Sequence, residues 1–212
     1  MNNREAIAII DVGLGNIASI QRMIEKAGGK AVPVIDPDQL HKGDKVILPG
    51  VGHYDEGMSR LTETGFADIL VNLGKTHEIH VLGICLGMQL LCRGSEEGGL
   101  PGLGLIDADV MKFRFPAESN LKVPHMGWNH VDQALDHPLW TGIPDHSRFY
   151  FVHSYWVDAA DSALVAGTFD YGVTGAAALA RDNLFAVQFH PEKSHDLGLR
   201  LLSNFLTWNG QC

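Results

Sequence analysis

Hydrophobic and polar positions follow two different patterns along the chain. Residues 6–10 form a continuous apolar run, which is typical of a strand buried on both faces of a sheet, and residues 31–35 and 45–48 predict a second and a third short strand. A segment with helical spacing follows residues 6–10 and extends as far as Lys26. Two more, at residues 54–61 and 65–75, follow residues 45–48. This alternation of strand and helix predicts a largely parallel sheet in the first half of the chain.

The second half is rich in strand-forming residues. Runs at 105–113, 148–152, 164–167, 176–181 and 184–188 predict strands, and residues 123–129 predict a compact loop with Trp128 at its tip. In segment 194–208, Leu197, Leu201, Phe205 and Trp208 share one face of a terminal helix. We therefore predict one α/β domain over residues 1–212. Its central mixed, largely parallel sheet is flanked by helices, and antiparallel strands are added in the C-terminal half.

Composition narrows the range of partners. The formal net charge of −9 argues against a nucleic-acid or anionic-membrane surface, since both need basic residues. The N-terminus lacks the pattern of a signal peptide, and no apolar stretch is long enough to cross a membrane. The three cysteines, Cys85, Cys92 and Cys212, have no disulfide-framework spacing. Together these features predict a cytoplasmic protein with free thiols, and we interpret Cys92 and Cys212 as structural.

Segment 81–91, VLGICLGMQLL, carries the first candidate for chemistry. Cys85 stands between Gly83 and Gly87, after an apolar run and before helix-favouring residues. This is the pattern of a nucleophile elbow, in which a strained turn exposes the nucleophile at a helix N-terminus that favours a thiolate. A buried structural cysteine in a glycine-rich turn fits the same residues.

The second candidate is His190, which follows an apolar run and precedes Pro191. Glu192 lies two residues further on, and strand-like geometry would place both side chains on one side. A histidine beside a carboxylate is a base with its orienting group, although His190 alone also fits an ordinary strand end. Two glycines, Gly50 and Gly52, follow another strand, where free backbone N–H groups suit an oxyanion hole. In an open α/β sheet such strand ends meet at one edge.

A third glycine-rich turn, DVGLGN at residues 11–16, follows the first strand. It superficially resembles a dinucleotide-binding fingerprint, but Ala18 stands where the third glycine would be, and no clear ribose-binding acid follows. A tight turn between strand and helix is the alternative interpretation.

Taken together, GICLGMQ at 83–89 and QFHPE at 188–192 resemble the triad-type, class I glutamine amidotransferases. PGVG at 49–52, SEEG at 95–98, KVPHMGWN at 122–129, YFVHSY at 150–155 and FHPEKS at 189–194 stand in the expected order. They are similar to the branch of that family that supplies ammonia to a synthase of histidine biosynthesis. The resemblance covers nearly the whole chain.

The resemblance implies a role for each matching residue. Cys85 would attack the carboxamide of glutamine to form a γ-glutamyl thioester, with His190 as general acid and base and Glu192 orienting it. The backbone N–H groups of Gly50, Val51 and Leu86 would form the oxyanion hole. Gln89 and the backbone of His153, Ser154 and Tyr155 would hold glutamine.

The resemblance also implies a partner. Ammonia would pass to a (β/α)8 synthase subunit in a heterodimer, with Trp128, Lys193 and Asn16 at the interface or tunnel, and with neither cofactor nor metal in the chain itself. Three alternatives remain open at this point: a paralogue that supplies ammonia for surface-sugar amidation, a stand-alone γ-glutamyl thiol hydrolase, and a binding module with a relic triad.

Overall fold

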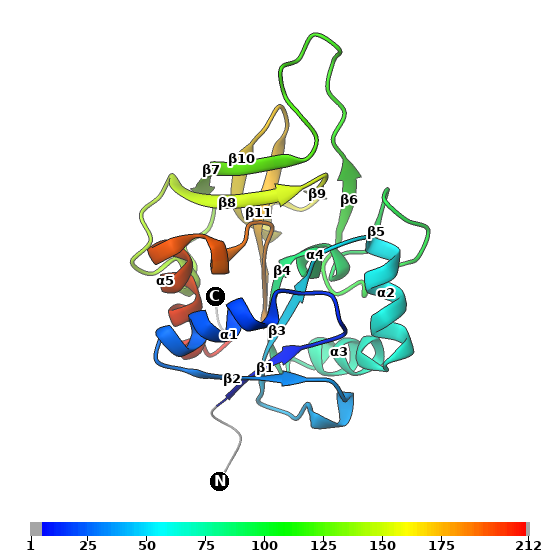
Figure 1. Cartoon of the computed structure of the whole chain (residues 1–212), viewed down its shortest axis with the longest axis vertical. Coiled ribbons are helices and arrows are strands. Elements are labelled where there is room, and N and C mark those ends of the chain that lie inside the picture. Colours follow the sequence, from blue (N-terminus) through cyan, green and yellow to red (C-terminus); the bar gives the residue numbers. More distant parts are fainter. Residues whose placement is uncertain (1–5, 211–212) are drawn as a thin grey trace.

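The computed structural model describes residues 6–210 and contains one twelve-stranded mixed sheet (Figure 1). Its strands are β1 (Ala6–Ile10), β2 (Lys30–Val34), β3 (Lys45–Gly50), β4 (His80–Cys85), β5 (Gly94–Ser95), β6 (Ala108–Lys112), β7 (His125–Gln133), β8 (Ser147–His153), β9 (Tyr155–Ala159), β10 (Val165–Asp170), β11 (Thr174–Arg181) and β12 (Leu184–Val187). The main order is β2-β1-β3-β4-β12-β11-β10-β7-β8, and β9 joins β6 to β11.

Helices cover both faces of the sheet. They are α1 (Ile17–Lys26), α2 (Tyr54–Glu63), α3 (Phe66–Lys75), α4 (Leu86–Leu90) and α5 (His195–Thr207), with 3-10 turns η2 (Pro37–Gln39), η3 (Pro138–Trp140), η4 (Ser162–Leu164) and η5 (Pro191–Lys193). Figure 1 shows α1 and α5 on one side and α2 and α3 on the other. Successive residues of β3 face opposite layers: Val46 and Leu48 pack in the α2–α3 core, and Ile47 packs in the α1–α5 core.

The sheet changes direction at β12. Strands β2, β1, β3, β4 and β12 pair in parallel, whereas β11 and the strands beyond it pair antiparallel. This arrangement confirms the predicted fold class. The predicted apolar face of the terminal helix is confirmed as well, because Leu201, Phe205 and Trp208 are buried and the partly buried Leu197 packs against the same core.

The pairing of β4 with β12 positions the site. Val81 lies opposite Leu184 and Ile84 lies opposite Val187, in parallel register. The residues that follow both strands therefore emerge at the same carboxyl edge, although they are far apart along the chain.

Two sequence-based predictions were wrong about local structure near this edge. Residues 123–129 do not form a compact loop, because β7 begins at His125 and pairs with β8 as far as Val131. Pro124 and Gly127 are turn-favouring residues, but a partner strand overrides that preference. Residues before β7 do leave the sheet, and the segment between β6 and β7 projects from the end of the molecule (Figure 1).

The third strand was also predicted too short. It continues past Leu48, with Pro49 opposite Ile84 and Gly50 opposite Cys85. Strand β9 was not predicted, the strand expected at 105–113 covers only Ala108–Lys112, and the one expected at 164–167 extends as Val165–Asp170. Between residues 6 and 210, no helix has the length and apolar character needed to span a membrane.

Candidate active site

Cys85 ends β4 in a strained conformation, with φ 54° and ψ −109°, immediately before α4. The flanking glycines are required by close approach. A Cβ on Gly87 would lie 1.8 Å from the carbonyl oxygen of Leu48, and one on Gly83 would lie 2.8 Å from Leu91 Cδ1. Glycine at both positions lets the turn pack tightly against β3 and α4, which fixes the sulfur at the edge of the sheet.

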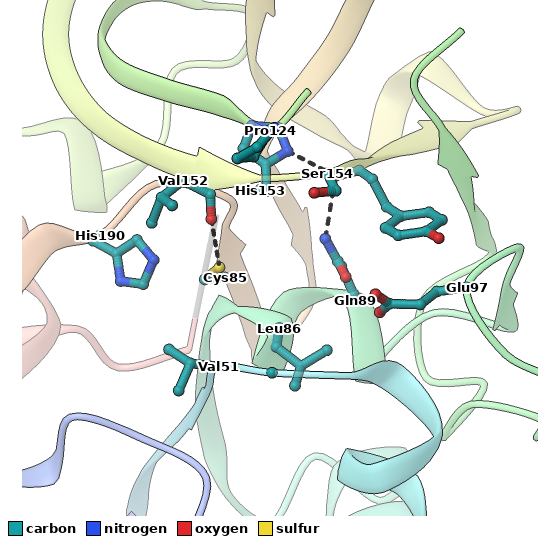
Figure 2. A pocket seen from close by; sticks show the side chains of 12 residues that line it. Val51, Cys85, Leu86, Gln89, Glu97, Pro124, Val152, His153, Ser154 and His190 are labelled. Carbon is teal, nitrogen blue, oxygen red and sulfur yellow. Dashed lines mark hydrogen bonds between the residues drawn. The ribbon is translucent and has the colours of Figure 1, made fainter. Parts of the chain in front are cut away.

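Cys85 is 6% exposed, and its sulfur lies between an acceptor and a donor. The carbonyl oxygen of Val152 is 3.9 Å away and can accept from the thiol, while the side-chain nitrogen of Gln188 is 3.7 Å away and can donate to sulfur. The ring of His190 lies beside Cys85 (Figure 2).

His190 pairs with Glu192 through a hydrogen bond of 2.8 Å from Nδ1 to Oε1, and both side chains are 2% exposed. The pair does not have the strand-like geometry expected from the sequence, because Pro191–Lys193 form the 3-10 turn η5. The turn still brings both side chains together. Ser194 fixes it by donating from Oγ to the carbonyl of His190 at 2.7 Å.

The electrostatic surroundings of His190 favour an imidazolium. Burial lowers its pKa, but Cys85 and Glu192 outweigh that effect and raise the pKa from 6.5 to about 10. Among the described residues, Nε2 of His190 has no partner at hydrogen-bonding distance and geometry. This nitrogen is therefore available to exchange a proton with a substrate or with sulfur.

A cavity of about 400 Å³ opens above the sulfur (Figure 2). Its lining residues are Val51, Gly52, Cys85, Leu86, Gln89, Glu97, Pro124, Val152, His153, Ser154, Tyr155 and His190. Of the residues expected to form the oxyanion hole, Val51 and Leu86 line the cavity, whereas Gly50 does not. A Cβ on Gly50 would come within 2.8 Å of Leu86 Cβ, so the two segments touch.

All four residues expected to hold the substrate line this cavity, but two of their side chains are engaged within the protein. Gln89 donates from Nε2 to the carbonyl of Tyr155 at 3.3 Å. His153 donates from Nδ1 to the same carbonyl at 2.6 Å. The turn between β8 and β9 is therefore held from both sides.

Sequence reasoning missed two residues of the site. Glu97 lines the cavity and accepts at Oε2 from the backbone N–H of Tyr54 at 2.9 Å, which ties the pocket to the start of α2. Its signal was the pair of acids in SEEG. Gln188 is fully buried against the sulfur, and its signal was a polar residue within an apolar run.

The three residues expected at a partner interface come from three elements: β7, η5 and the turn before α1. Trp128 is 39% exposed and stacks on His195, and Lys193 places its ammonium group 5.8 Å from the ring centre of Tyr150. Trp128 and Lys193 thus meet around Tyr150, whose ring centre is 6.1 Å from that of Trp128. Asn16 is exposed at the turn between β1 and α1, and α1 contacts the η5 turn that carries Lys193.

The other cysteines differ from Cys85. Cys92 is a buried free thiol, and burial raises its pKa well above the ordinary value, which disfavours the reactive thiolate. Cys212 lies outside the described residues.

A cysteine, a buried histidine and a carboxylate around one cavity can perform acyl transfer through a thioester. Comparison with known proteins gives the class. The family description "Glutamine amidotransferase class-I" matches residues 8–208. The chain therefore belongs to the class-I glutamine amidotransferase family.

Curated relatives narrow the group further. The chain is 46% identical over 200 residues to imidazole glycerol phosphate synthase subunit HisH 2 of Methanococcus maripaludis, covering 94% of this chain and 98% of the relative. It is 47% identical over 209 residues to the HisH subunit of Aromatoleum aromaticum, covering 95% and 98%. Within the family, it groups with these HisH subunits.

Solved structures agree in fold. The PurLQS structure from Thermotoga maritima matches with a TM-score of 0.74 at 16% identity, covering 96% of this chain and 98% of that one. A glutamine amidotransferase from the same organism matches with a TM-score of 0.62 at 16% identity, covering 90% of this chain and 77% of that one.

Proposed function

We propose that this chain is the glutaminase subunit of an imidazole glycerol phosphate synthase. It hydrolyses glutamine to glutamate and ammonia and delivers the ammonia to a (β/α)8 synthase partner in a heterodimer. There the ammonia is used to make imidazole glycerol phosphate and an aminoimidazole carboxamide ribonucleotide in histidine biosynthesis. The observation that carries the proposal is the assembly of Cys85 with the His190–Glu192 pair at one cavity, in a chain 46% identical to HisH subunits.

The proposed reaction has two acyl-transfer steps. The Cys85 thiolate attacks the side-chain carbonyl carbon of glutamine, and the tetrahedral intermediate collapses when His190 gives a proton to the leaving nitrogen, releasing ammonia. This leaves a γ-glutamyl thioester on sulfur. His190 then takes a proton from water, which attacks the thioester, and glutamate leaves as the thiolate forms again. Glu192 orients the ring through Nδ1 and stabilises its charged form.

Backbone N–H groups would stabilise the negative charge that develops on the carbonyl oxygen of glutamine. We assign this role to the N–H of Leu86 and to the segment of Gly50 and Val51, because both segments meet beside the sulfur. Glu97 faces the same cavity, and its carboxylate suits the α-ammonium group of glutamine (Figure 2).

We further propose that the protein works in the cytoplasm. Two buried cysteines, Cys85 and Cys92, are free thiols, which suits a reducing compartment.

The deciding experiment compares two nitrogen sources in the complex with the synthase partner. Cys85→Ala should abolish product formation from glutamine and leave formation from added ammonium salt unchanged. Cys92→Ala is the matched control and should retain both activities. Full glutamine-dependent activity in Cys85→Ala would refute the proposal.

A second measurement separates a synthase subunit from a stand-alone hydrolase. The glutaminase rate of the isolated chain should be very low and should rise when the partner and the partner's substrate are added. A high rate without the partner would favour the stand-alone γ-glutamyl hydrolase.

A further inference from the structure

Gln188 is the one fully buried side-chain amide in direct contact with the sulfur among the described residues. Its backbone N–H donates to the carbonyl of Ala177 at 2.9 Å, so β11 fixes its main chain. Its side-chain nitrogen lies 3.7 Å from Cys85 Sγ, and its oxygen accepts from Gln89 Nε2 at 3.0 Å. The amide therefore bridges the nucleophile and the glutamine-facing residue.

Neighbouring groups decide which end of this amide meets the sulfur. The carbonyl of Tyr155 can only accept, so the side-chain nitrogen of Gln89 must be the atom facing it at 3.3 Å. That same nitrogen is the atom turned towards Gln188. Gln188 must then present its oxygen to Gln89, which leaves its N–H group for the sulfur.

Two neutral histidines hold the far end of this chain of hydrogen bonds. His153 donates from Nδ1 to the Tyr155 carbonyl, which leaves Nε2 to accept, and Nδ1 of His125 lies 2.9 Å from it. The remaining nitrogen of His125 faces the amide nitrogen of Asn129 at 3.3 Å, and Asn129 also donates to the carbonyl of Asp170 at 2.8 Å. The donor and the acceptor of every hydrogen bond in this series are therefore fixed.

Burial keeps both histidines in the state that these donors and acceptors need. It lowers the pKa of His125 to about 4, and it lowers the pKa of His153 to about 3, to which the neighbouring His125 and His190 also contribute. Aromatic rings enclose the pair, with His125 stacked on both Phe151 and Tyr171. Neither histidine ring is charged near neutral pH, so the donors and acceptors do not reverse.

We propose that Gln188 is a further catalytic residue of the proposed glutaminase, stabilising the Cys85 thiolate with an N–H donor. This inference rests on the proposed function of the site. The sulfur has a partner in each protonation state. As a thiol it donates to the Val152 carbonyl, and as a thiolate it accepts from Gln188. A hydrogen bond to the charged form favours that form.

The test measures the thiolate directly. In the full-length chain, the rate of Cys85 alkylation by iodoacetamide is followed against pH, with mass spectrometry of the Cys85 peptide as the readout. Gln188→Met keeps the volume and removes the donor. Its midpoint should rise by about one pH unit, which gives about a tenfold lower rate below the midpoint and corresponds to about 1.4 kcal/mol. Gln133→Met is the matched control, because Gln133 bonds a distant carbonyl, that of Ile143, at 2.9 Å. Its midpoint should not move.

A second substitution at the same position, Gln188→Leu, tests the donor by a different change. It removes both polar ends of the amide and leaves an aliphatic side chain beside the sulfur, so its midpoint should rise by at least as much as that of Gln188→Met. An unchanged midpoint in either folded variant, judged by circular dichroism, would overturn the inference. The two proposals fail separately: an active Cys85→Ala enzyme refutes the glutaminase, whereas an unshifted alkylation profile refutes only the role of Gln188.

Discussion

Nδ1 of His190 lies 2.8 Å from Oε1 of Glu192, in a pair whose side chains are both 2% exposed. Glu192 is one of the groups that raise the pKa of His190. Removing its charge while keeping its shape should therefore weaken the imidazolium and release the ring from its orientation.

We expect Glu192→Gln to lower kcat for glutamine by about 10²–10⁴-fold, the range associated with general acid–base catalysis. KM should change little, because Glu192 does not line the cavity. The rate of glutamate release, measured in the complex with the synthase partner and the partner's substrate, gives both kcat and KM. Ammonium-dependent synthesis is the internal control, and an unaltered kcat would show that the carboxylate does not orient the base.

The neutral histidine pair should make the protein sensitive to acid. Because the folded-state pKa of His125 is about 4, below the unfolded value of 6.5, its contribution is present above pH 6.5 and is lost as pH falls towards 4. His125→Phe keeps an aromatic ring against Tyr171 and removes this titration. Between pH 7 and pH 5 the wild-type protein should lose about 2 kcal/mol more stability than the variant. Urea unfolding at the two pH values measures the difference, and parallel losses would contradict the buried neutral state.

Gly50 tests the packing of the proposed oxyanion hole. A Cβ there would lie 2.8 Å from Leu86 Cβ and 3.1 Å from the backbone nitrogen of Gly87, so Gly50→Ala should push the two N–H segments apart. We expect kcat for glutamine to fall by about 10²–10³-fold, the effect of losing one oxyanion donor. Gly94→Ala is the matched control, because nothing lies within 4 Å of its Cβ position. Equal kcat in both variants would show that Gly50 does not contribute to the oxyanion hole.

Glu97 provides a test of substrate binding rather than chemistry. Its carboxylate faces the cavity and accepts from the backbone N–H of Tyr54 at 2.9 Å. If it holds the α-ammonium group of glutamine, Glu97→Gln should raise KM about tenfold or more, since hydrogen bonds to charged groups contribute about 1.5–3 kcal/mol. The kcat should be nearly unchanged. Glu96→Gln is the control on the same loop, because Glu96 pairs with Arg114. A rise in KM for Glu96→Gln, with no rise for Glu97→Gln, would show that Glu96 and not Glu97 binds the α-ammonium group.

The elements that sequence predicted well are those whose own residues determine them. The run Ala6–Ile10 forms β1 with the predicted bounds, and the glycines around Cys85 mark a turn that no larger residue fits. Both signals are local: an uninterrupted apolar run buries on both faces, and a missing Cβ permits close approach.

Predictions failed where a distant strand decides the outcome. His125 begins a strand because β8 lies beside it, and Gly50 stays in β3 because it pairs with Cys85. The contacts that Gln188 makes were also not predictable from the sequence. Gln188 is one polar residue in an apolar run, and only folding places it between Gln89 and the sulfur. Such contacts depend on tertiary packing, which spacing along the chain does not encode.

The face beside the cavity should bind the synthase partner. Apolar side chains are exposed along β7 and its approach: Met126 is 61% exposed, Val123 45% and Trp128 39%. Neighbouring apolar groups left in water are typical of an interaction surface, and large aromatic residues contribute most of the binding energy at such surfaces. Trp128→Ala should therefore weaken binding of the partner by about 2 kcal/mol, or about thirtyfold in Kd. Ile35→Ala is the control, because Ile35 is 71% exposed beside the edge strand β2. Calorimetric titration of the partner into each variant measures Kd. A Trp128→Ala complex as tight as the Ile35→Ala complex would place the interface on another face of the sheet.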